Sequence, residues 1–553
     1  MKKYIAVILT LLFVLSLSAC GGNSGTETVS DSTGTSSADA APSAVTDSEI
    51  TAKEATDAFS ITSEDGAFGN SGSVYTITSA GTYVVSGLLD GQIVVNAGEN
   101  DEVVIELSGA TIGCSDDSPI KILSAGAVDV SAKKDTENVI NDTRDAMTEA
   151  DDEQGSGAIS ANCDLKIKGT GTLLVNASYN NGIHTTKDLE IQKLSLKVTA
   201  YNNALKGNDS VAVTSGTVVA ISTNGDGVKT ENTDTNKYGE TRGDILISGG
   251  SVTVYAAGDG FQAAHDFAMT TGEDGTTAAV AIYTGSYSGY TASDAATASY
   301  KGVKAANEVN IEDGTVTVQS YDDGLHADQG ASFDDGTTGS GTVNISGGTV
   351  TMNVYAPENK TAGGQMGPGD WGGQQTVSGA DGIHADGSLN VSGGVINIDS
   401  AYEGLEANVI NVSGGKTCVS ANDDGVNACS GDQTPQVNVS GGYLDVTVSP
   451  DSDTDGIDSN GTYSQTGGVV ITRGPNNQNM AAIDTESAAS VTGGTLIILG
   501  YGRVNTGGSV RSYSLSLHSA GTHTVTIDGV SYTFTNTESY GSTTCLSDVS
   551  VSA

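Results

Sequence analysis

The sequence predicts an all-β fold, a right-handed parallel β-helix whose rungs hold about 22 residues each. A glycine-centred phrase recurs along the chain, as in "DDGLHAD" around Gly324 and "ADGIHADGSLNVSGG" around Gly382. Where nothing interrupts the repeat, its step is 22 residues, from Gly302 to Gly324 and from Gly382 to Gly404. A unit this short cannot bury a core of its own, so the copies must stack on one another.

The segments between the turns read as short strands. Apolar residues alternate with polar ones, as at Val343 and Ile345 or at Leu389 and Val391, which is the period of a half-buried strand. The repeats are rich in Gly, Ser, Thr and Val and poor in helix formers, which disfavours a leucine-rich or helical solenoid. The usual chirality of connections between parallel strands favours a right-handed coil.

The N-terminus predicts export and lipidation. Lys2 and Lys3 precede an apolar run that is too short for a membrane span. The run leads into "LSAC", which resembles a bacterial lipobox with Cys20 as the lipidated residue. We therefore predict a lipoprotein signal peptide at 1–19 and a flexible tether at 20–66, rich in Ser, Thr, Gly and Ala. The protein is expected to be extracellular, on the outer face of the bacterial cytoplasmic membrane, and to touch the membrane only through its lipid.

The rest of the chain divides by its repeats. Residues 67–500 carry them and are predicted to form the β-helix, while residues 501–553 are expected to cap its end with a few strands. Insertions at 231–243, 266–299 and 329–341 break the rhythm and should hang outside the coil. Such insertions would shape any groove on the surface.

The charge limits the partners. The formal net charge is -44 at pH 7. Phosphates would be repelled, which argues against nucleic acid or an anionic bilayer as a binding partner. Either divalent cations balance this charge, or the acidity only keeps a secreted protein soluble.

Strand alternation predicts an outward-facing column. The residue after each turn glycine is apolar and should point inward, so the next one points outward. Adjacent rungs lie ~4.8 Å apart, so column members are neighbours in space. The column contains His184, Lys206, Lys229, Gln262, Lys304, His326, His384, Glu406, Asn427, Asp458 and Asp484.

Carboxylates gather around the same turns. Carboxylates stacked at rung spacing repel one another unless a cation lies between them. Hard cations with oxygen ligands suit such a site, Ca²⁺ above all. The competing interpretation is that these Asp residues only serve the turns. The predicted calcium ligands are a subset of Asp322, Asp323, Asp328, Asp381, Asp386, Asp423 and Asp424.

Aromatic residues offer a second kind of site. Tyrosines lie two or three residues before several turn glycines, where they form either a structural ladder or platforms for sugar rings. The candidates are Tyr179, Tyr201, Tyr321 and Tyr402. Trp371, the only tryptophan, lies in the Gly- and Pro-rich insertion "APENKTAGGQMGPGDWGGQQT". It is either an anchor against the solenoid or a ligand platform.

The serial phrases "DDGLHAD", "VNISGGTVTM", "ADGIHADGSLNVSGG" and "YEGLEANVINVSGG" resemble a family of secreted carbohydrate-binding β-helix proteins best known from a cellulolytic clostridium. The likeness covers about residues 67–500. It implies binding of plant cell-wall polysaccharide, both cellulose and polygalacturonate, on a calcium-containing right-handed β-helix similar to polysaccharide lyases.

Two functions follow. In the first, the protein is a monomer that captures polysaccharide without catalysis, through Lys206, Lys229, Lys304, the four tyrosines and Trp371. In the second, it is a calcium-dependent pectate lyase in which one of the three lysines removes the C5 proton of a uronate. A lyase needs one irregular site, whereas a repeat offers many equivalent ones, so binding is favoured and no catalytic residue is assigned.

Overall fold

The computed structural model describes residues 50–146, 156–291, 299–355, 379–450, 454–476, 480–487 and 489–553. The predicted signal peptide, Cys20, the first part of the predicted tether and Trp371 lie outside these residues. The described chain is all-β apart from one short 3-10 helix, η2 (Gly285–Ser288). Within the described ranges, no helix is long and apolar enough to cross a membrane.

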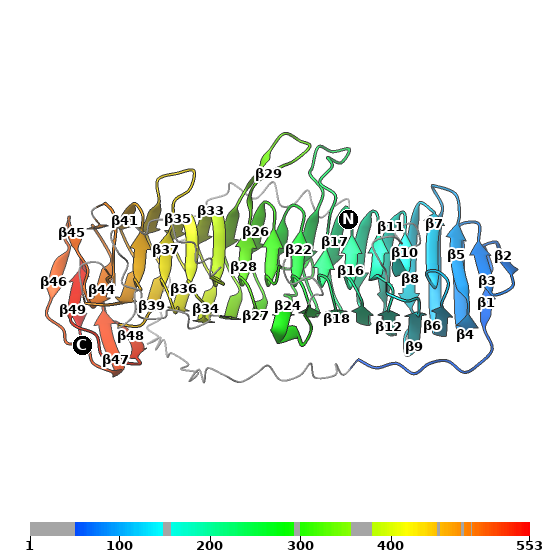
Figure 1. Cartoon of the computed structure of the whole chain (residues 1–553), viewed down its shortest axis with the longest axis horizontal. Helices are drawn as coiled ribbons and strands as arrows, with labels where there is room; N and C mark the ends of the chain where they lie inside the picture. Colours follow the sequence, from blue (N-terminus) through cyan, green and yellow to red (C-terminus); the bar gives the residue numbers. More distant parts are fainter. Residues whose placement is uncertain are drawn as a thin grey trace, which may run out of the picture.

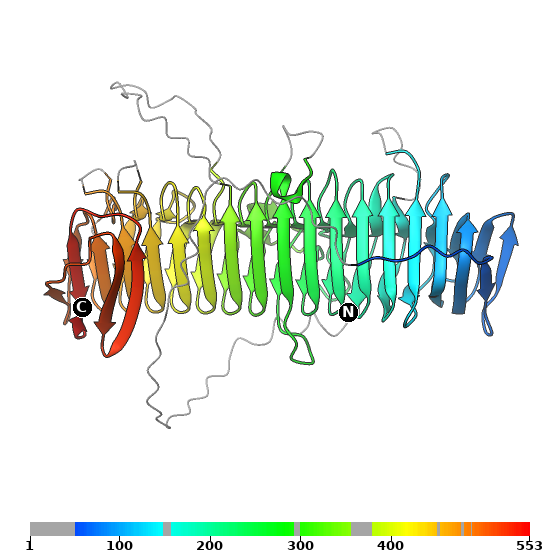
Figure 2. The ribbon, with the colours of Figure 1, turned by 90° about the horizontal axis from the view of Figure 1, so that it is seen from below.

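The strands stack in sequence order along one long axis. Figure 1 shows the colours running from blue to red along that axis, and Figure 2 shows the same order from below. Most pairs in the large sheet are parallel, and each strand pairs with its counterparts in the neighbouring copies of the repeat. The fold is therefore all-β, with long parallel-dominated sheets, and is consistent with a β-helix-like solenoid.

Three parallel stacks make up the solenoid. The turn-glycine stack consists of β3 (Val74–Ile77), β5 (Gln92–Asn96), β7 (Ile120–Ser124), β10 (Gly157–Ala161), β13 (Asn181–Thr185), β16 (Leu205–Gly207), β19 (Val228–Lys229), β22 (Phe261–Ala263), β25 (Val303–Ala305), β28 (Leu325–Ala327), β33 (Ile383–Val391), β35 (Leu405–Val412), β37 (Val426–Ala428) and β40 (Ile457–Ser459). The groove stack consists of β4 (Gly81–Asp90), β6 (Glu102–Cys114), β8 (Ala127–Ala132), β11 (Asp164–Gly169), β14 (Asp188–Gln192), β17 (Ser210–Val213), β20 (Asp244–Ile247), β23 (Phe267–Met269), β26 (Glu308–Ile311), β31 (Thr342–Ile345), β33, β35, β38 (Gln436–Val439), β41 (Thr462–Gln465), β43 (Ala489–Val491) and β45 (Val504–Thr506). The third stack begins with β4 and β6 and continues with β9 (Glu137–Asp142), β12 (Thr172–Ala177), β15 (Ser195–Ala200), β18 (Thr217–Ser222), β21 (Ser251–Ala256), β24 (Ala279–Thr284), β27 (Thr315–Ser320), β32 (Thr349–Val354), β34 (Val395–Ser400), β36 (Lys416–Ser420), β39 (Tyr443–Thr447), β42 (Val469–Arg473) and β44 (Thr495–Leu499).

One continuous hydrophobic core runs through the stacks. The apolar residue after each turn glycine is buried in it, as predicted: Ile183, Leu205, Val228, Phe261, Val303, Leu325, Ile383, Leu405, Val426 and Ile457. The turn itself requires glycine, because a Cβ at Gly227 would lie 2.1 Å from Val254 Cγ1 and 2.7 Å from the carbonyl oxygen of Gly260. The repeated glycine therefore lets the chain turn against the core of the next rung.

The fold begins before residue 67. Strand β1 (Ser60–Thr62) pairs antiparallel with β4, and Ile61 is buried. This corrects the prediction of a flexible tether through residue 66. The polar composition of the segment concealed a strand that contributes one apolar side chain to the end of the core.

The C-terminal end carries antiparallel strands. The groove stack continues past residue 500 into β45, and β49 (Thr543–Ser547) pairs antiparallel with β44 and with β46 (Arg511–Tyr513). Strands β47 (Gly521–Ile527), β48 (Val530–Asn536) and β50 (Val551–Ser552) form a separate antiparallel sheet over a second, smaller core.

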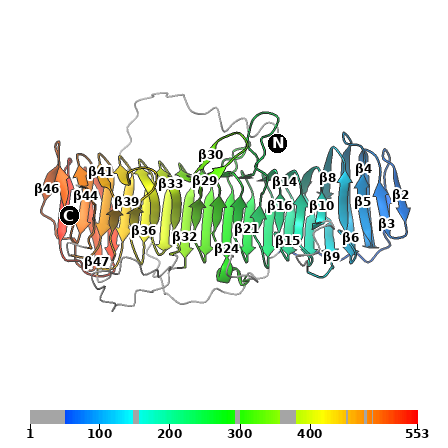
Figure 3. The same cartoon turned by 45° about the horizontal axis from the view of Figure 1, so that its top comes forward.

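Two of the predicted insertions project together. The loop at 231–243 and the hairpin of β29 (Gln329–Ser332) and β30 (Thr338–Ser340) leave the same side of the solenoid (Figures 1 and 3). The hydroxyl of Thr241 in the loop donates to Asp335 Oδ2 in the hairpin at 2.9 Å. The predicted insertion at 266–299 is corrected in part, because β23 and β24 within it belong to the stacks.

Candidate functional site

The predicted outward column forms in the turn-glycine stack. Lys206 pairs with His184 on one side and with Lys229 on the other, and His326 pairs with Lys304 and His384. Glu406 follows His384, and Asn427 and Asp458 come next. The column therefore changes from basic to acidic along the axis.

The three predicted lysines each have a carboxylate partner. Lys206 Nζ lies 2.7 Å from Glu231 Oε1, Lys229 Nζ 3.0 Å from Asp226 Oδ2, and Lys304 Nζ 3.3 Å from Asp328 Oδ2. Burial would lower the pKa of Lys229, but the Asp226 carboxylate raises it above its usual range. Lys229 is thus an ammonium ion at neutral pH, and it is not poised to accept a proton.

In several rungs, the residue before the turn glycine supports the turn of the next rung. The backbone N–H of Asp381 donates to Asp323 Oδ1 at 2.8 Å, and that of Glu403 donates to Asp381 Oδ1 at 3.3 Å. The N–H of Asp455 likewise donates to Asp424 Oδ1 at 2.7 Å. One oxygen, Oδ1, of each of these carboxylates therefore supports a turn, as the interpretation that competed with calcium binding predicted.

Two neighbouring rungs repeat one hexapeptide, Asp-Gly-Leu/Ile-His-Ala-Asp, at 323–328 and 381–386. The rings of His326 and His384 stack with centroids 4.7 Å apart and 19° between their planes. Each ring lies between the two acids of its own hexapeptide. Nδ1 faces the first acid, at 2.7 Å in 323–328 and 2.9 Å in 381–386, and Nε2 faces the second, at 2.9 Å and 3.2 Å. The second histidine also has Glu406 Oε2 at 3.2 Å from its Nδ1.

These contacts separate the pKa values of the carboxyl groups. Burial would raise the pKa of Asp323, but the hydrogen bond with His326 and the charge of Lys301 hold it well below its usual range. Burial would also raise the pKa of Glu406, but its hydrogen bond with His384 lowers this pKa to about 2. For Glu403, burial and the charges of Glu406 and Asp381 act in the same direction, and together they raise its pKa to about 10. Glu403 is therefore protonated at neutral pH.

A cavity of about 370 Å³ opens over this cluster. Its lining includes the two histidines, Asp323, Asp381, Glu403, Glu406, Tyr402 and Lys301. Lys301 Nζ lies 2.7 Å from Asp323 Oδ2 and 3.0 Å from Asp322 Oδ2. Two imidazoles, several carboxylates and one ammonium thus face a common space.

The predicted calcium ligands divide into two sets. Asp322, Asp323, Asp328, Asp381 and Asp386 surround the histidines and Lys301, which supply N–H donors to their oxygens. Nitrogen-rich surroundings suit Ca²⁺ poorly. Asp423 and Asp424 lie at the acidic end, where burial and the charges of Asp423 and Asp455 raise the pKa of Asp424 to about 8. This second set fits a hard cation better.

Sequence reasoning missed four members of the cluster as site residues. His326, His384 and Glu406 were placed in the outward column but given no role, and Lys301 was not considered. The signal that could have found them is the hexapeptide repeated with histidine in two successive copies. Lys301 gives no such signal, because it occupies the position that carries Asp or Asn in neighbouring rungs.

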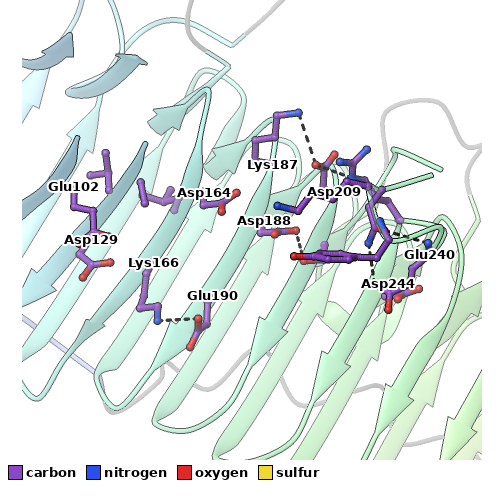
Figure 4. Close-up of a pocket in the computed structure, with 18 of the residues that line it drawn as sticks. Glu102, Asp129, Asp164, Lys166, Lys187, Asp188, Glu190, Asp209, Glu240 and Asp244 are labelled. Carbon is purple, nitrogen blue, oxygen red and sulfur yellow. Dashed lines mark hydrogen bonds and ion pairs between the residues drawn. The ribbon is translucent and has the colours of Figure 1, made fainter. Parts of the chain in front are cut away.

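A larger groove of about 900 Å³ lies on the groove stack (Figure 4). Parallel strands β6, β8, β11, β14, β17 and β20 form its floor, and the loop at 231–243 forms one side. Glu102, Asp129, Lys166 and Glu190 come from successive strands of the floor, as the figure shows. The groove thus follows the long axis across several rungs.

Carboxylates outnumber cations in the groove. The acids are Glu102, Asp129, Asp164, Asp188, Glu190, Asp209, Glu240 and Asp244, and the cations are Lys166, Lys187, Lys237 and Arg242. Lys166 Nζ lies 2.9 Å from Glu190 Oε2, and Arg242 Nε lies 3.1 Å from Asp209 Oδ2. The groove therefore offers many hydrogen-bond acceptors and few uncompensated positive charges.

Tyr238 is the aromatic residue of this groove. Its side chain is 63% exposed, and Lys237 Nζ lies 5.1 Å from the centre of its ring. The loop that carries it is closed by Asn236, whose side-chain N–H donates to Glu240 Oε2 at 2.9 Å. Sequence reasoning identified this loop as a groove-shaping insertion but did not select Tyr238, because Tyr238 lies outside the repeat.

The predicted tyrosines have different surroundings. Tyr179 is buried under the guanidinium of Arg144, which lies 3.9 Å from the ring centre, so it does not offer a free face. Tyr321 stacks on Tyr355 with centroids 4.2 Å apart, as a structural ladder would. Tyr402 lines the cavity over the histidines, and Tyr201 is half-buried.

Comparison with known proteins identifies a family that this sequence matches. The family described as carbohydrate-binding domain-containing protein matches residues 71–353 and 331–425. A carbohydrate-binding domain-containing protein of Acetivibrio thermocellus is 31% identical over 200 residues, which are 36% of this chain. The chain spans 65% of the length of that relative. The chain is also similar to a solved structure of a polysaccharide lyase-like protein from C. thermocellum, a gadolinium derivative, with 32% sequence identity. The match covers 45% of this chain and 90% of the chain in that structure, with a TM-score of 0.38.

Proposed function

Since the chain belongs to the family of carbohydrate-binding domain-containing proteins, we propose that it binds plant cell-wall polysaccharide without cleaving it. The binding site in this proposal is the groove under the loop at 231–243, on a right-handed parallel β-helix. The observation that carries the proposal is the groove itself: about 900 Å³, running over several rungs, with an exposed aromatic ring at its side. Ligand sites of this kind combine apolar surface with a few placed polar groups.

The electrostatics of the groove favour a neutral polysaccharide. Its carboxylates can accept hydrogen bonds from sugar hydroxyls, whereas Lys166, Lys187 and Arg242 are engaged by neighbouring acids. The ring of Tyr238 can stack on the apolar face of a sugar. Cellulose-type glucan is therefore the proposed ligand of the groove.

Polygalacturonate would bind elsewhere and through calcium. We assign Ca²⁺ to Asp423 and Asp424 together with Asp458, where burial and the charges of neighbouring acids raise the pKa of Asp458 to about 6. Oxygen ligands without histidine suit Ca²⁺, and a bound cation could bridge the protein to uronate carboxylates. Lys206, Lys229 and Lys304 contribute less than the sequence suggested, because each already has a carboxylate partner.

In this proposal, the protein is located on the outer face of the bacterial cytoplasmic membrane. Lipid on Cys20 and the segment that follows it would hold a monomeric solenoid away from the cell, with the groove open to extended polymers. Labelling with a palmitate analogue and its loss in Cys20→Ala would test the anchor.

The alternative, a calcium-dependent lyase with a lysine base, has less support. A base must be able to accept a proton near neutral pH. Lys229 is held as an ammonium ion by Asp226, and Lys206 and Lys304 are likewise ion-paired. Release of unsaturated uronides by the purified protein, abolished by Lys229→Ala, would establish the lyase and contradict the proposal of binding alone.

The test of groove binding is substitution of its aromatic residue. Tyr238→Ala should weaken adsorption to cellulose by about 10- to 100-fold, since burying an aromatic ring contributes about 1.5–3 kcal/mol. Tyr355→Ala is the matched control, because Tyr355 is also exposed but stacks on Tyr321, outside the groove. Loss of binding in Tyr355→Ala alone would place the site on the tyrosine ladder instead.

A further inference from the structure

The stacked histidines form a site that neither calcium binding nor groove binding uses. A ring nitrogen of His326, a ring nitrogen of His384 and a carboxylate oxygen of Asp323 lie within 4.8 Å of one another. A second group with the same property joins His384 to Asp381 and Glu406. Because both groups share His384, the two groups together place five potential ligand side chains around the stacked rings.

The Nδ1 side of the two rings is the better side for an ion. There, the side chains of Asp323 and Asp381 are 5% exposed and that of Glu406 is 18% exposed. On the Nε2 side, Asp328 and Asp386 are 35% and 39% exposed, where water competes for an ion. The cavity of about 370 Å³ also opens on the Nδ1 side, so it leaves room for water or another ligand.

The ligand atoms that these side chains offer decide which kind of metal ion suits the site. Imidazole nitrogen with carboxylate oxygen suits Zn²⁺ and the neighbouring divalent transition metals, whereas Ca²⁺ takes oxygen ligands. We propose that His326, His384, Asp323, Asp381 and Glu406 bind one divalent transition-metal ion, with Zn²⁺ as its representative. The ion replaces the protons on the two Nδ1 atoms and sits between the carboxylates of two successive rungs.

Lys301 is compatible with this site. Its ammonium is shared between Asp322 and Asp323, and on Asp323 it contacts Oδ2, the same oxygen that faces His326 Nδ1, so it balances part of the charge of Asp323. Asp381 and Glu406 then supply further carboxyl oxygens for a divalent ion. We expect Lys301 to lower the affinity without abolishing it, so Lys301→Gln should bind Zn²⁺ more tightly.

Calorimetric titration of the metal-stripped full chain with Zn²⁺ at pH 7.5 tests the proposal. We expect one Zn²⁺ per chain, released protons, and no displacement by a tenfold excess of Ca²⁺. His384→Gln removes the ligand shared by both groups, so it should weaken binding by more than the roughly 10- to 100-fold cost of losing an outer-shell partner. Glu406→Gln should weaken binding less.

His265→Gln is the matched control, because His265 is also bonded to a carboxylate, Asp244 at 2.8 Å, but lies in another cluster. It should leave the Zn²⁺ titration unchanged. If His384→Gln fails to fold, as judged by circular dichroism, the Glu406→Gln titration and the d–d absorption of bound Co²⁺ keep the test decisive.

Three results would overturn the assignment: no Zn²⁺ uptake, equal uptake by His384→Gln and the wild type, or equal affinity for Ca²⁺. In the first case the histidines are imidazolium ions that only neutralise buried acids. The titration uses no polysaccharide, so its failure is distinguishable from a failure of groove binding.

Discussion

At the scale of single residues, buried carboxylates make the stability of this protein depend on pH. Burial and the charge of Asp226 raise the pKa of Asp259 to about 7. A carboxyl group with a raised pKa binds more protons in the folded state than in the unfolded state, so the contribution of Asp259 to stability is fully present at low pH and is lost as pH rises from about 4 through about 7.

Asp259→Asn should therefore flatten this dependence. The amide oxygen can still accept the N–H of Lys301, which now donates to Asp259 Oδ1 at 2.7 Å. We expect a smaller fall in melting temperature between pH 5 and pH 8 than in the wild type. Asp313→Asn, at a half-buried residue whose carboxyl pKa is lowered by its hydrogen bond with Thr271, should leave the slope unchanged. Equal slopes in all three proteins would refute this account of Asp259.

The turn glycines make a second prediction at this scale. Gly227→Ala would bring a Cβ to 2.1 Å from Val254 Cγ1, and such overpacking costs about 1–3 kcal/mol. Gly69 has no atom within 4 Å of the equivalent position, so Gly69→Ala should melt like the wild type. The measurement is the melting temperature of both variants; a wild-type value for Gly227→Ala would contradict the packing argument.

Strand alternation was enough to predict which residues point outward, because the side-chain period of two is fixed by the backbone. It correctly made Lys304, His326 and His384 neighbours. It could not predict that Lys304 bonds to Asp328 and His326 to Asp323, because these contacts depend on side-chain torsions. The lysines were therefore overestimated as ligand contacts, and the histidines were underestimated.

At the scale of elements, the loop at 231–243 and the hairpin of β29 and β30 hold one another. Thr241 is buried and donates to Asp335 Oδ2 at 2.9 Å, which joins two segments far apart in sequence. Thr241→Val keeps the shape of the side chain but removes this bond, whose net contribution is about 0.5–1.5 kcal/mol.

We expect faster hydrogen exchange in residues 231–243 of Thr241→Val, together with weaker adsorption to cellulose, because Tyr238 lies in that loop. Thr276→Val is the control, since Thr276 bonds to Asp274 within its own loop. Unchanged exchange in Thr241→Val would mean that the contact with the hairpin does not hold the loop.

The sequence predicted these loops because they interrupt the repeat, but it could not predict that they contact each other. Their conformations rest on contacts across rungs, such as that of Thr241 with Asp335. The same limit explains Ser60–Thr62, where a strand of three residues lies inside a polar segment. Periodicity is informative only where a segment repeats.

At the scale of the whole molecule, the charge of -44 should make the solenoid responsive to calcium. An ion that binds only the folded state raises the free energy of unfolding by RT ln(1 + [L]/Kd), and the melting temperature rises with it. Millimolar Ca²⁺ should therefore stabilise the full chain more than the same ionic strength of NaCl.

Asp424→Asn should reduce this stabilisation, whereas Asp90→Asn, at an exposed carboxylate near the other end, should not. Equal responses to Ca²⁺ in both variants would remove the assignment of calcium to the acidic end. If neither Ca²⁺ nor EDTA changes the melting temperature of the wild type, the proposal that this protein binds calcium is wrong.

The most direct test of polysaccharide binding in the groove is an adsorption isotherm of the full chain on cellulose. We predict saturable binding that persists in EDTA, falls about 10- to 100-fold in Tyr238→Ala, and is retained in Tyr355→Ala. Binding that is lost in EDTA, or that is equally strong in Tyr238→Ala and the wild type, would contradict the assignment of the groove as the polysaccharide site.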